Sequence, residues 1–183
     1  MWEVNKPQPV KLIIGILAAD QTCLVAAVET VRAKFGPLDL ESTVWPFTQT
    51  EYYKEQAGPN ILRQFVTIEK LIDPGDLAEI KLTTNRIEQD LSQKLAGDLP
   101  RPVNLDPGTL EPSKLVLAST KNFSHRIYIG QNIYAELTLS FIKGTWQSYS
   151  YTFSDYKGPN YHPFLTKARE KLVGQLGQAG RRN

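Results

Sequence analysis

Four side chains that could bind an anion or move a proton lie within six residues of one another. They are Lys121, Asn122, His125 and Arg126, and they follow directly on the apolar stretch at residues 115–118. Lysine, asparagine and arginine donate hydrogen bonds to anions, and the pKa of histidine suits proton transfer near neutral pH. A solvated loop whose histidine bonds a backbone carbonyl would have the same composition. Because loops between rigid elements often carry function, both interpretations stay open.

A second polar group comprises Arg101, Asn104 and Asp106, and it ends at Gly108. An aspartate before Pro-Gly is typical of a tight turn, in which the carboxylate bonds the backbone two residues further on. That explanation accounts for Asp106 completely, and we favour it. In the alternative, Arg101 donates to an anion and Asp106 acts as a metal ligand or a base.

A third group lies on one flank of a predicted helix, because Lys81, Asn85, Glu88 and Ser92 follow at helical spacing. Such a stripe is usually a solvated flank. It could take part in binding only where that flank borders the other two groups. Cys23 falls in the first turn of another predicted helix, where the helix dipole could lower the pKa of its thiol. A small buried residue is the favoured interpretation.

Residues 126–154 alternate like an antiparallel meander, and its register can be predicted from the apolar pattern. A three-residue loop at 143–145 places Leu139 opposite Tyr149. A loop at 130–132 places Ile129 opposite Ile133, Ile127 opposite Ala135, Arg126 opposite Glu136 and Tyr128 opposite Tyr134. One sheet face then carries Arg126, Glu136, Thr152, Tyr128, Tyr134, Thr138, Ser140, Ser148 and Ser150. We favour a solvated face over a binding platform.

The elements that position these side chains alternate between strand and helix patterns. Asp20 and Asp73 are predicted to cap helices, and residues 58–60 read as a turn. We expect strands at 10–17, 42–53, 62–71 and 115–118, and helices at 20–35, 73–95 and 163–176. Residues 97–113 are expected to form a long loop, in which 103–108 is a short extended piece that ends in a tight turn. This order predicts one α+β domain over residues 1–183, with a ferredoxin-like β-α-β-β-α-β start extended by an antiparallel meander and a C-terminal helix. Residues 1–9 are expected to form an N-terminal extension, and residues 177–183 a basic flexible tail.

Composition excludes several classes of protein. The 183 residues carry a formal net charge of +2, which gives no support for a broad basic nucleic-acid face. The longest apolar run, at residues 12–19, is too short to span a bilayer, and the start lacks the pattern of a signal peptide. We therefore expect a cytoplasmic protein with no membrane partner. The single cysteine excludes an internal disulfide, and phosphate-loop, dinucleotide and His-Glu-x-x-His motifs are missing.

Seven motifs spread along nearly the whole chain carry a resemblance to a known family. They are Lys11-Leu12, Phe35-Gly36-Pro37, Thr50-x-Tyr52-Tyr53, Ile80-Lys81-Leu82-Thr83-Thr84-Asn85, Val103-Asn104-Leu105-Asp106-Pro107-Gly108, Thr120-Lys121-Asn122-x-x-His125-Arg126-Ile127-Tyr128 and Asp155-Tyr156. In these the chain resembles a family of uncharacterised bacterial proteins, known as a domain of unknown function. The resemblance implies no established activity, so no residue role is carried over. A GTP-binding label on some members gives a hint towards nucleotides.

The leading hypothesis is that the chain binds a small anionic or phosphorylated ligand such as a nucleotide, with turnover left open. His125, Asp106 and Glu136 are the candidate catalytic groups, and Asp106 and Glu136 could also hold a divalent ion, Mg²⁺ or Mn²⁺. The predicted ligand-binding residues are Arg63, Arg101, Asn104, Lys121, Asn122, Arg126, Tyr128, Tyr134, Lys81 and Asn85. This hypothesis requires the named groups to converge in one pocket. The alternative is a non-enzymatic module whose tyrosine-rich sheet face binds a protein or single-stranded RNA.

Overall fold

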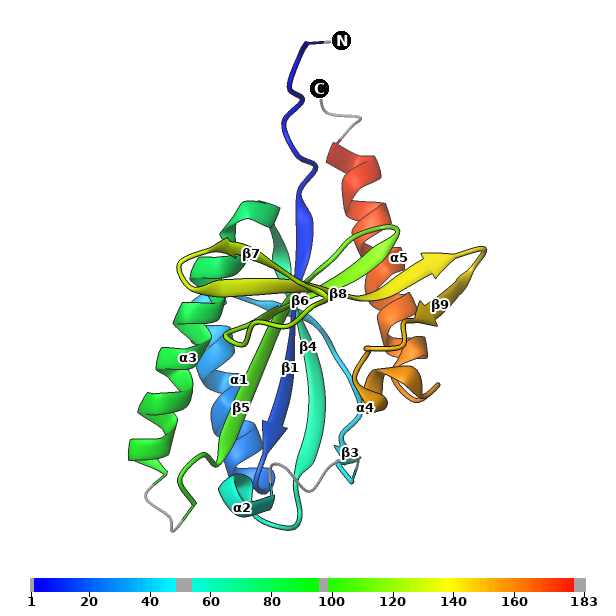
Figure 1. The fold of residues 1–183 in the computed structure, drawn as a ribbon. Coiled ribbons are helices and arrows are strands. Elements are labelled where there is room, and N and C mark those ends of the chain that lie inside the picture. The colour runs from blue at the N-terminus through cyan, green and yellow to red at the C-terminus, as the bar shows by residue number, and fades with distance from the viewer. Residues whose placement is uncertain (1, 49–53, 96–98, 180–183) are drawn as a thin grey trace.

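In a computed structural model, the described part of the chain forms one α+β domain built on an antiparallel sheet of nine strands (Figure 1). The structure describes residues 2–48, 54–95 and 99–179. The strand order is β2-β4-β1-β5-β6-β8-β7, with β3 paired to β4 and β9 paired to β8. The predicted α+β class is therefore confirmed.

The first half of the domain surrounds a central strand that is buried along its whole length. Its elements are β1 (Val10–Ala18), α1 (Gln21–Phe35), β2 (Leu38–Glu41), β3 (Trp45–Pro46), α2 (Lys54–Ala57), β4 (Leu62–Ile72), a 3₁₀ turn (Pro74–Asp76) and α3 (Leu77–Lys94). The cap at Asp20 is confirmed, since Asp20 accepts from the backbone N–H of Cys23. Asp73 accepts from the backbone N–H of Gly75 and so caps the 3₁₀ turn that precedes α3.

The second half adds the other strands and a closing helix. Its elements are β5 (Val103–Leu110), β6 (Lys114–Ser119), β7 (Arg126–Gly130), β8 (Ile133–Ile142), β9 (Thr145–Ser148), α4 (Ser154–Lys157) and α5 (His162–Ala179). α5 extends to Ala179, three residues beyond the predicted end of the closing helix at 176, and residues 180–183 of the predicted tail lie outside the described part. Residues 2–9 have no regular secondary structure and are exposed.

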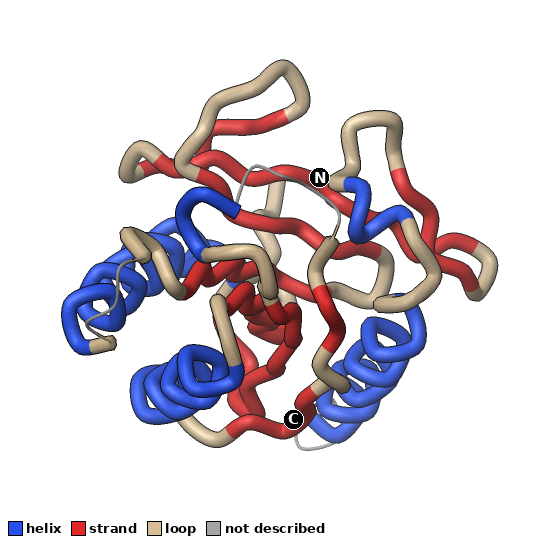
Figure 2. The backbone as a smooth tube through the Cα atoms, turned by 90° about the horizontal axis from the view of Figure 1, so that it is seen from below, coloured by secondary structure: helices blue, strands red, loops and turns tan. Residues whose placement is uncertain are grey.

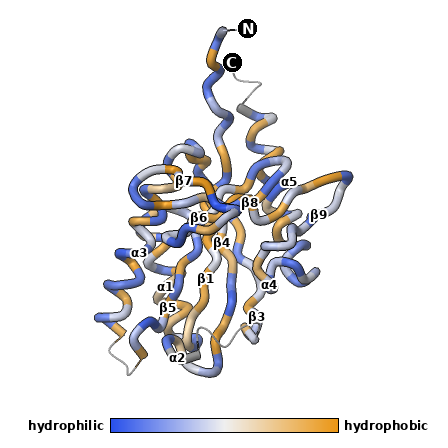
Figure 3. The backbone as a smooth tube through the Cα atoms, in the orientation of Figure 1, coloured by the Kyte–Doolittle hydropathy of each residue, from blue (hydrophilic) through white to orange (hydrophobic). Residues whose placement is uncertain are grey.

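Helices cover the two faces of the sheet, with α1 and α3 on one side and α5 on the other (Figure 2). Successive residues of β1 point to opposite faces, so Ile14 and Ile16 pack beneath α1 and α3, whereas Ile13 packs with residues of α5. Burial on both faces explains why β1 is apolar at nearly every position, with Lys11 as its charged exception, and is coloured largely orange and white in Figure 3.

Two predicted boundaries are wrong. The strand expected at residues 42–53 is reduced to the two-residue β3 in its described part, because β2 ends at Glu41 and residues 49–53 lie outside the described part. The turn expected at Asp106-Pro107-Gly108 does not form, because β5 runs straight through these residues and pairs with β1. The favoured explanation of Asp106 as a turn former is therefore wrong, since tertiary pairing overrides the local turn signal.

The meander register is confirmed in one hairpin and wrong in the other. Arg126 pairs with Glu136, Ile127 with Ala135 and Tyr128 with Tyr134, but a bulge then places Gly130 opposite Ile133, where Ile129 was expected. In the second hairpin Leu139 lies opposite Ser148 and not Tyr149, because the loop has two residues. Lys143 and Gly144 both have positive φ, which a two-residue hairpin loop requires.

The predicted polar sheet face is not a uniformly solvated surface. Glu136, Thr138 and Thr152 are buried, and Thr152 Oγ1 donates to the backbone oxygen of Thr138. The interpretation favoured from sequence is therefore wrong at these three positions. Among the described residues, no helix is long and apolar enough to cross a membrane.

Candidate functional site

The candidate site lies where β5 and β6 separate. The two strands pair from Gly108 to Leu110, and the preceding five residues of β5 have no strand partner on that side among the described residues. The split begins at Pro107, which has no N–H to donate to a neighbouring strand. Gly108 lets the strands approach closely, because a Cβ there would lie 2.5 Å from the backbone oxygen of Val116.

Side chains of α3 take the place of the missing strand. Lys81 Nζ donates to the backbone oxygen of Leu105 at 2.7 Å, and the backbone N–H of Leu105 donates to Glu88 Oε1 at 2.8 Å. Residues two apart on a strand aim their backbone groups to the same side, so the nitrogen of Pro107 also faces the split. Lys81 and Glu88 are buried, and the favoured interpretation of this stripe as a solvated flank is wrong for both.

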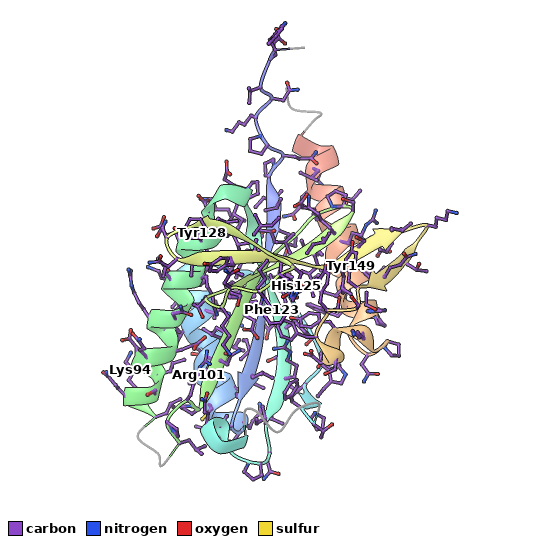
Figure 4. All side chains as sticks on the ribbon, viewed as in Figure 1. Lys94, Arg101, Phe123, His125, Tyr128 and Tyr149 are labelled. Atoms are coloured by element: carbon purple, nitrogen blue, oxygen red, sulfur yellow. The ribbon has the colours of Figure 1, made fainter. Side chains whose placement is uncertain are left out.

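Glu88 also anchors the loop that leads into β5. Its Oε2 accepts from Arg101 Nε at 2.9 Å and from Arg101 Nη2 at 2.5 Å. Burial raises the pKa of Glu88, although the charges of Lys81 and Arg101 act in the opposite direction. In Figure 4, Arg101 lies at the lower end of β5 beside α3, and His125 and Phe123 lie at the crossing with the upper strands.

A cavity of about 550 Å³ occupies the split. This volume is in the range of small-molecule sites. The lining residues come from β1, β4, α3, β5, β6, β7, β8, α4 and the loops between them. They are Leu17, Phe47, Arg63, Lys81, Arg101, Asn104, Asp106, Leu117, Ala118, Ser119, Thr120, Lys121, Arg126, Glu136, Phe153, Ser154, Asp155 and Tyr156.

Arg63 is the buried centre of this cavity. Its Nη1 lies 3.4 Å from Asp106 Oδ2, and its Nη2 donates to Asp155 Oδ2 at 3.2 Å and to the Tyr156 hydroxyl at 3.0 Å. Gly15 makes room for the guanidinium, because a Cβ there would lie 3.2 Å from Arg63 Nη1. The Arg63 guanidinium also lies over the ring of Phe65, 4.7 Å from its centroid. Arg63 is thus fixed from several sides.

The two carboxyl groups on Arg63 differ in their pKa. Burial raises the pKa of Asp106, but the charges of Lys81 and Arg63 outweigh it, so the pKa of Asp106 lies below its ordinary value. Burial dominates at Asp155, whose pKa is raised although Arg63 opposes the shift. Asp106 is therefore the carboxylate that stays ionised to lower pH.

A second charged group lies on β7 and β8. Arg126 Nε donates to Glu136 Oε2 at 2.9 Å, and His125 Nε2 lies 3.0 Å from the same oxygen. Arg126 Nη1 donates to Ser119 Oγ and to the backbone oxygen of Lys121, both at 3.0 Å. The His125 ring stacks on Tyr151, with centroids 4.2 Å apart. Glu136 is thus held through Oε2, and its other oxygen, Oε1, is buried without a partner in the described structure.

Three buried polar atoms among the lining side chains have no hydrogen-bond partner in the described structure. They are Arg63 Nε, Asn104 Nδ2 and Glu136 Oε1. Asn104 Nδ2 lies close enough to the Asp106 carboxylate to lower the pKa of Asp106, but it does not meet the geometry of a hydrogen bond. An unpaired buried polar atom costs about 1–3 kcal/mol, so atoms of this kind point to a ligand or ordered water. Two of the three are donors and one is a carboxylate acceptor, which sets the polarity that a ligand must match.

Most of the predicted site residues line the cavity, and some do not. Arg63, Lys81, Arg101, Asn104, Asp106, Lys121, Arg126 and Glu136 line it. His125 lies behind Glu136 and contacts the cavity only through it. Asn85, Asn122, Tyr128 and Tyr134 are not among the lining residues. Tyr128 and Tyr134 instead form an edge-to-face pair with centroids 5.5 Å apart.

Sequence reasoning did not select Asp155, Tyr156, Glu88 or Tyr151 as site residues. Asp155 and Tyr156 end the meander and were part of the family resemblance, and Glu88 belonged to the helix stripe. Their contacts join segments far apart in the chain, such as Arg63 with Asp155, and no local pattern encodes such contacts. The predicted register also places Tyr151 opposite Leu137 in a strand, whereas Tyr151 lies in the turn after β9 and stacks on His125.

The described residues contain no group of three or more His, Cys, Asp or Glu side chains that could hold a metal ion. Two carboxylates, Asp106 and Glu136, were the expected ligands. Mg²⁺ and Mn²⁺ usually take six ligands and keep several waters, and often bind through substrate phosphates. A metal here would therefore need oxygen atoms from the ligand itself.

A comparison with family models decides the family. Residues 8–172 match the model described as Domain of unknown function (DUF4416). The chain belongs to DUF4416. The match includes every element from β1 to the greater part of α5, and therefore every residue that lines the cavity. Neither a search of curated proteins nor a search of solved structures finds a match.

Proposed function

We propose that this DUF4416 chain binds a small anionic ligand, such as a phosphorylated compound, in the cavity between β5 and β6. The observation that carries the proposal is the set of unpaired buried atoms on Arg63, Asn104 and Glu136, which all belong to the lining of that cavity. The two donors, Arg63 Nε and Asn104 Nδ2, suit the oxygens of a phosphate or carboxylate.

We also propose that the chain turns the ligand over. Glu136 is the candidate general base, because Arg126 and His125 hold its Oε2 in place and leave Oε1 without a partner in the described structure. A general base must lie within hydrogen-bond reach of the proton that it removes, and Glu136 Oε1 is the buried acceptor without a partner. Asp106 is the second candidate, although it is already 3.4 Å from Arg63.

Thermal unfolding tests the binding step. The native chain is heated with inorganic phosphate, sugar phosphates and nucleotides, each with and without Mg²⁺ or Mn²⁺. A ligand at 100 times its Kd stabilises the folded state by about 2.7 kcal/mol, which shifts the midpoint measurably. Asn104→Leu removes the unpaired amide with little change in volume, and we expect it to reduce the shift.

The control variant is Tyr128→Ala, which changes an exposed side chain outside the cavity lining. It should leave a ligand-induced shift unchanged. Absence of any shift across the panel would contradict the proposal, and so would a shift that persists in full in Asn104→Leu. A shift that needs Mg²⁺ or Mn²⁺ would support a metal held jointly by the ligand and the carboxylates.

A second candidate function is binding of a partner on the surface of β7. Exposed apolar side chains gather there and in the preceding loop, where Ile127 is 73% and Tyr128 58% exposed, and Phe123 is exposed as well. An aliphatic side chain such as Ile127 cannot stack on a base, and the net charge of +2 is small, so a protein is favoured over single-stranded RNA. Loss of a captured partner in Tyr128→Ala, with no response to anions, would favour this candidate.

Three finer expectations from the sequence are also proposed. The strand order β2-β4-β1-β5, with α1 and α3 packed on the same face, supports a ferredoxin-like start. A bacterial origin rests on the family resemblance alone, and a cytoplasmic location stays a proposal.

A further inference from the structure

The two ends of the main strand order differ in how well their edges are protected. β2 forms one end and β7 the other. At β2, Lys171 Nζ on α5 donates to the backbone oxygen of Asp39 at 3.1 Å, and Glu41 pairs with Arg32. Charged side chains and contacts from another element are two of the ways in which proteins keep an edge strand from pairing with a second chain. The edge at β2 has both.

The edge at β7 is apolar and exposed. Among the described residues, β7 pairs with β8 and with no other strand. Ile127, Tyr128 and Ile129 are 73%, 58% and 37% exposed. Arg126, the one charged residue of β7, turns towards Glu136 on the neighbouring strand, and the bulge lies beyond Tyr128 at the hairpin end. An edge of this kind is suited to pairing with another β-strand.

The sequence of β7 favours a second copy of this chain as the partner. In antiparallel pairing about a two-fold axis at Tyr128, Tyr128 lies opposite itself and Ile127 lies opposite Ile129 of the second copy. Aromatic then meets aromatic and aliphatic meets aliphatic, and such cross-strand pairs stabilise a sheet. Arg126 would lie opposite Gly130, so no like charges meet. The edge is therefore complementary to itself.

The exposed area sets the strength that such a dimer can have. With about 150–250 Å² for each fully covered side chain, Ile127, Tyr128 and Ile129 expose about 250–400 Å² on each copy. Two copies would bury about 500–800 Å² through these side chains, whereas stable interfaces bury about 1,200–2,000 Å². The area therefore predicts a weak, reversible dimer, with a Kd above about 1 µM.

We infer that two copies of the chain form a two-fold symmetric dimer in which their β7 strands pair antiparallel, so that the sheet of one copy continues into the sheet of the other. This inference goes beyond anion binding in the cavity. It also commits the second candidate function, partner binding at β7, to one partner of defined chemistry.

Sedimentation equilibrium on the native chain tests the inference. Between about 5 and 500 µM, the average mass should rise from 20.6 kDa towards twice that value. Ile127→Lys places a charge in the pairing surface of each copy and should keep the chain monomeric throughout. Val25→Lys is the matched control, because Val25 is a branched side chain on α1 that is 50% exposed, and it should dimerise like the native chain.

A cross-link gives a second test that does not depend on the folding of Ile127→Lys. Directly opposite residues of antiparallel strands have Cα atoms about 4.5–5.5 Å apart, which is within disulfide range. Tyr128→Cys, at the two-fold axis, should therefore form a covalent dimer when treated with diamide. Val25→Cys should stay largely monomeric under the same conditions. The native Cys23 is buried, so it should add little background.

The outcomes separate this inference from anion binding. A mass rise that is lost in Ile127→Lys and kept in Val25→Lys supports the inference. A native chain that stays monomeric at the highest concentration overturns it, and so does a dimer that persists in full in Ile127→Lys. Equal cross-linking of Tyr128→Cys and Val25→Cys, or capture of a different protein at β7 by a monomeric chain, also overturns it. Ligand-induced thermal shifts measure anion binding separately, and Ile127→Lys should keep them.

Discussion

Replacement of Arg63 by methionine tests whether this side chain is the electrostatic centre of the cavity. Arg63→Met keeps a long, flexible side chain but removes the cation that contacts Asp106 and Asp155. Both carboxylates then stay in a buried environment without their guanidinium. Removing one partner of a buried ion pair costs about 3–5 kcal/mol, because the remaining charge is uncompensated. We expect a loss of that size in the free energy of unfolding at pH 7.

The stability cost of Arg63→Met should depend on pH and become smaller as the pH falls. Without Arg63, the pKa of Asp155, already raised by burial, rises further, and the pKa of Asp106 loses one of the charges that lower it. A carboxyl whose folded-state pKa lies above its unfolded value takes up its proton first in the folded state. The folded variant therefore regains about 1.4 kcal/mol per pH unit and group as the pH falls from that raised pKa towards the ordinary value near 4. The difference between the variant and the native chain should shrink between pH 7 and pH 4.

Urea unfolding followed by tryptophan fluorescence measures this difference at each pH. Arg32→Met is the matched control, because Arg32 and Glu41 form an ion pair whose side chains are 48% and 41% exposed. An exposed pair contributes at most about 1 kcal/mol, so the control should lose little stability. A cost below about 1 kcal/mol for Arg63→Met at pH 7, or a cost that does not shrink at pH 4, would refute the reasoning.

Three further predictions concern the strands and the first helix. Gly108→Ala should cost about 1–3 kcal/mol by urea unfolding, because its Cβ would lie 2.5 Å from a backbone oxygen, whereas Gly15→Ala meets only side-chain atoms at 3.1 Å or more and should cost less. Burial and the neighbouring Asp20 raise the pKa of the Cys23 thiol to about 11. Cys23 should therefore react with a disulfide reagent at pH 8 far more slowly than free cysteine, and equal rates would contradict this. Asp20→Ala should cost about 0.5–2 kcal/mol through loss of the helix cap, and it should lower the pKa of Cys23; unchanged thermal stability would count against the cap.

The sequence allowed the elements with strong local signals to be predicted. The apolar run of β1, the capping residues Asp20 and Asp73, and the helical spacing in α1 and α3 each act over a few residues, and the structure confirms them. The β7–β8 register was also predictable up to Tyr128, because one apolar face specifies the pairing. The bulge at Gly130 and the two-residue loop at Lys143 depend on backbone conformation, which alternation of residue types does not encode.

The candidate site was harder to predict, because its contacts are made between distant segments. Asp106-Pro107-Gly108 has the composition of a turn, and only pairing with β1 shows that these residues belong to a strand. In the sequence, Lys81 and Glu88 look like the polar flank of a helix. In the structure they bind the backbone oxygen and N–H of Leu105, which no neighbouring strand pairs within the described residues. Their charges were visible in the sequence, but the reason for their burial was not.

The same feature that ends the strand pairing also creates the cavity. A strand that loses its neighbour exposes backbone donors and acceptors, and in a folded domain these must be satisfied. Here Glu88 and Lys81 satisfy the backbone of Leu105, and they bring charge into the interior. Buried charges need partners, which accounts for Arg101 beside Glu88 and for the position of Lys81 near Asp106. The proline in β5 and the charged lining of the cavity are thus parts of one arrangement, and a ligand that supplies the last hydrogen bonds would complete it.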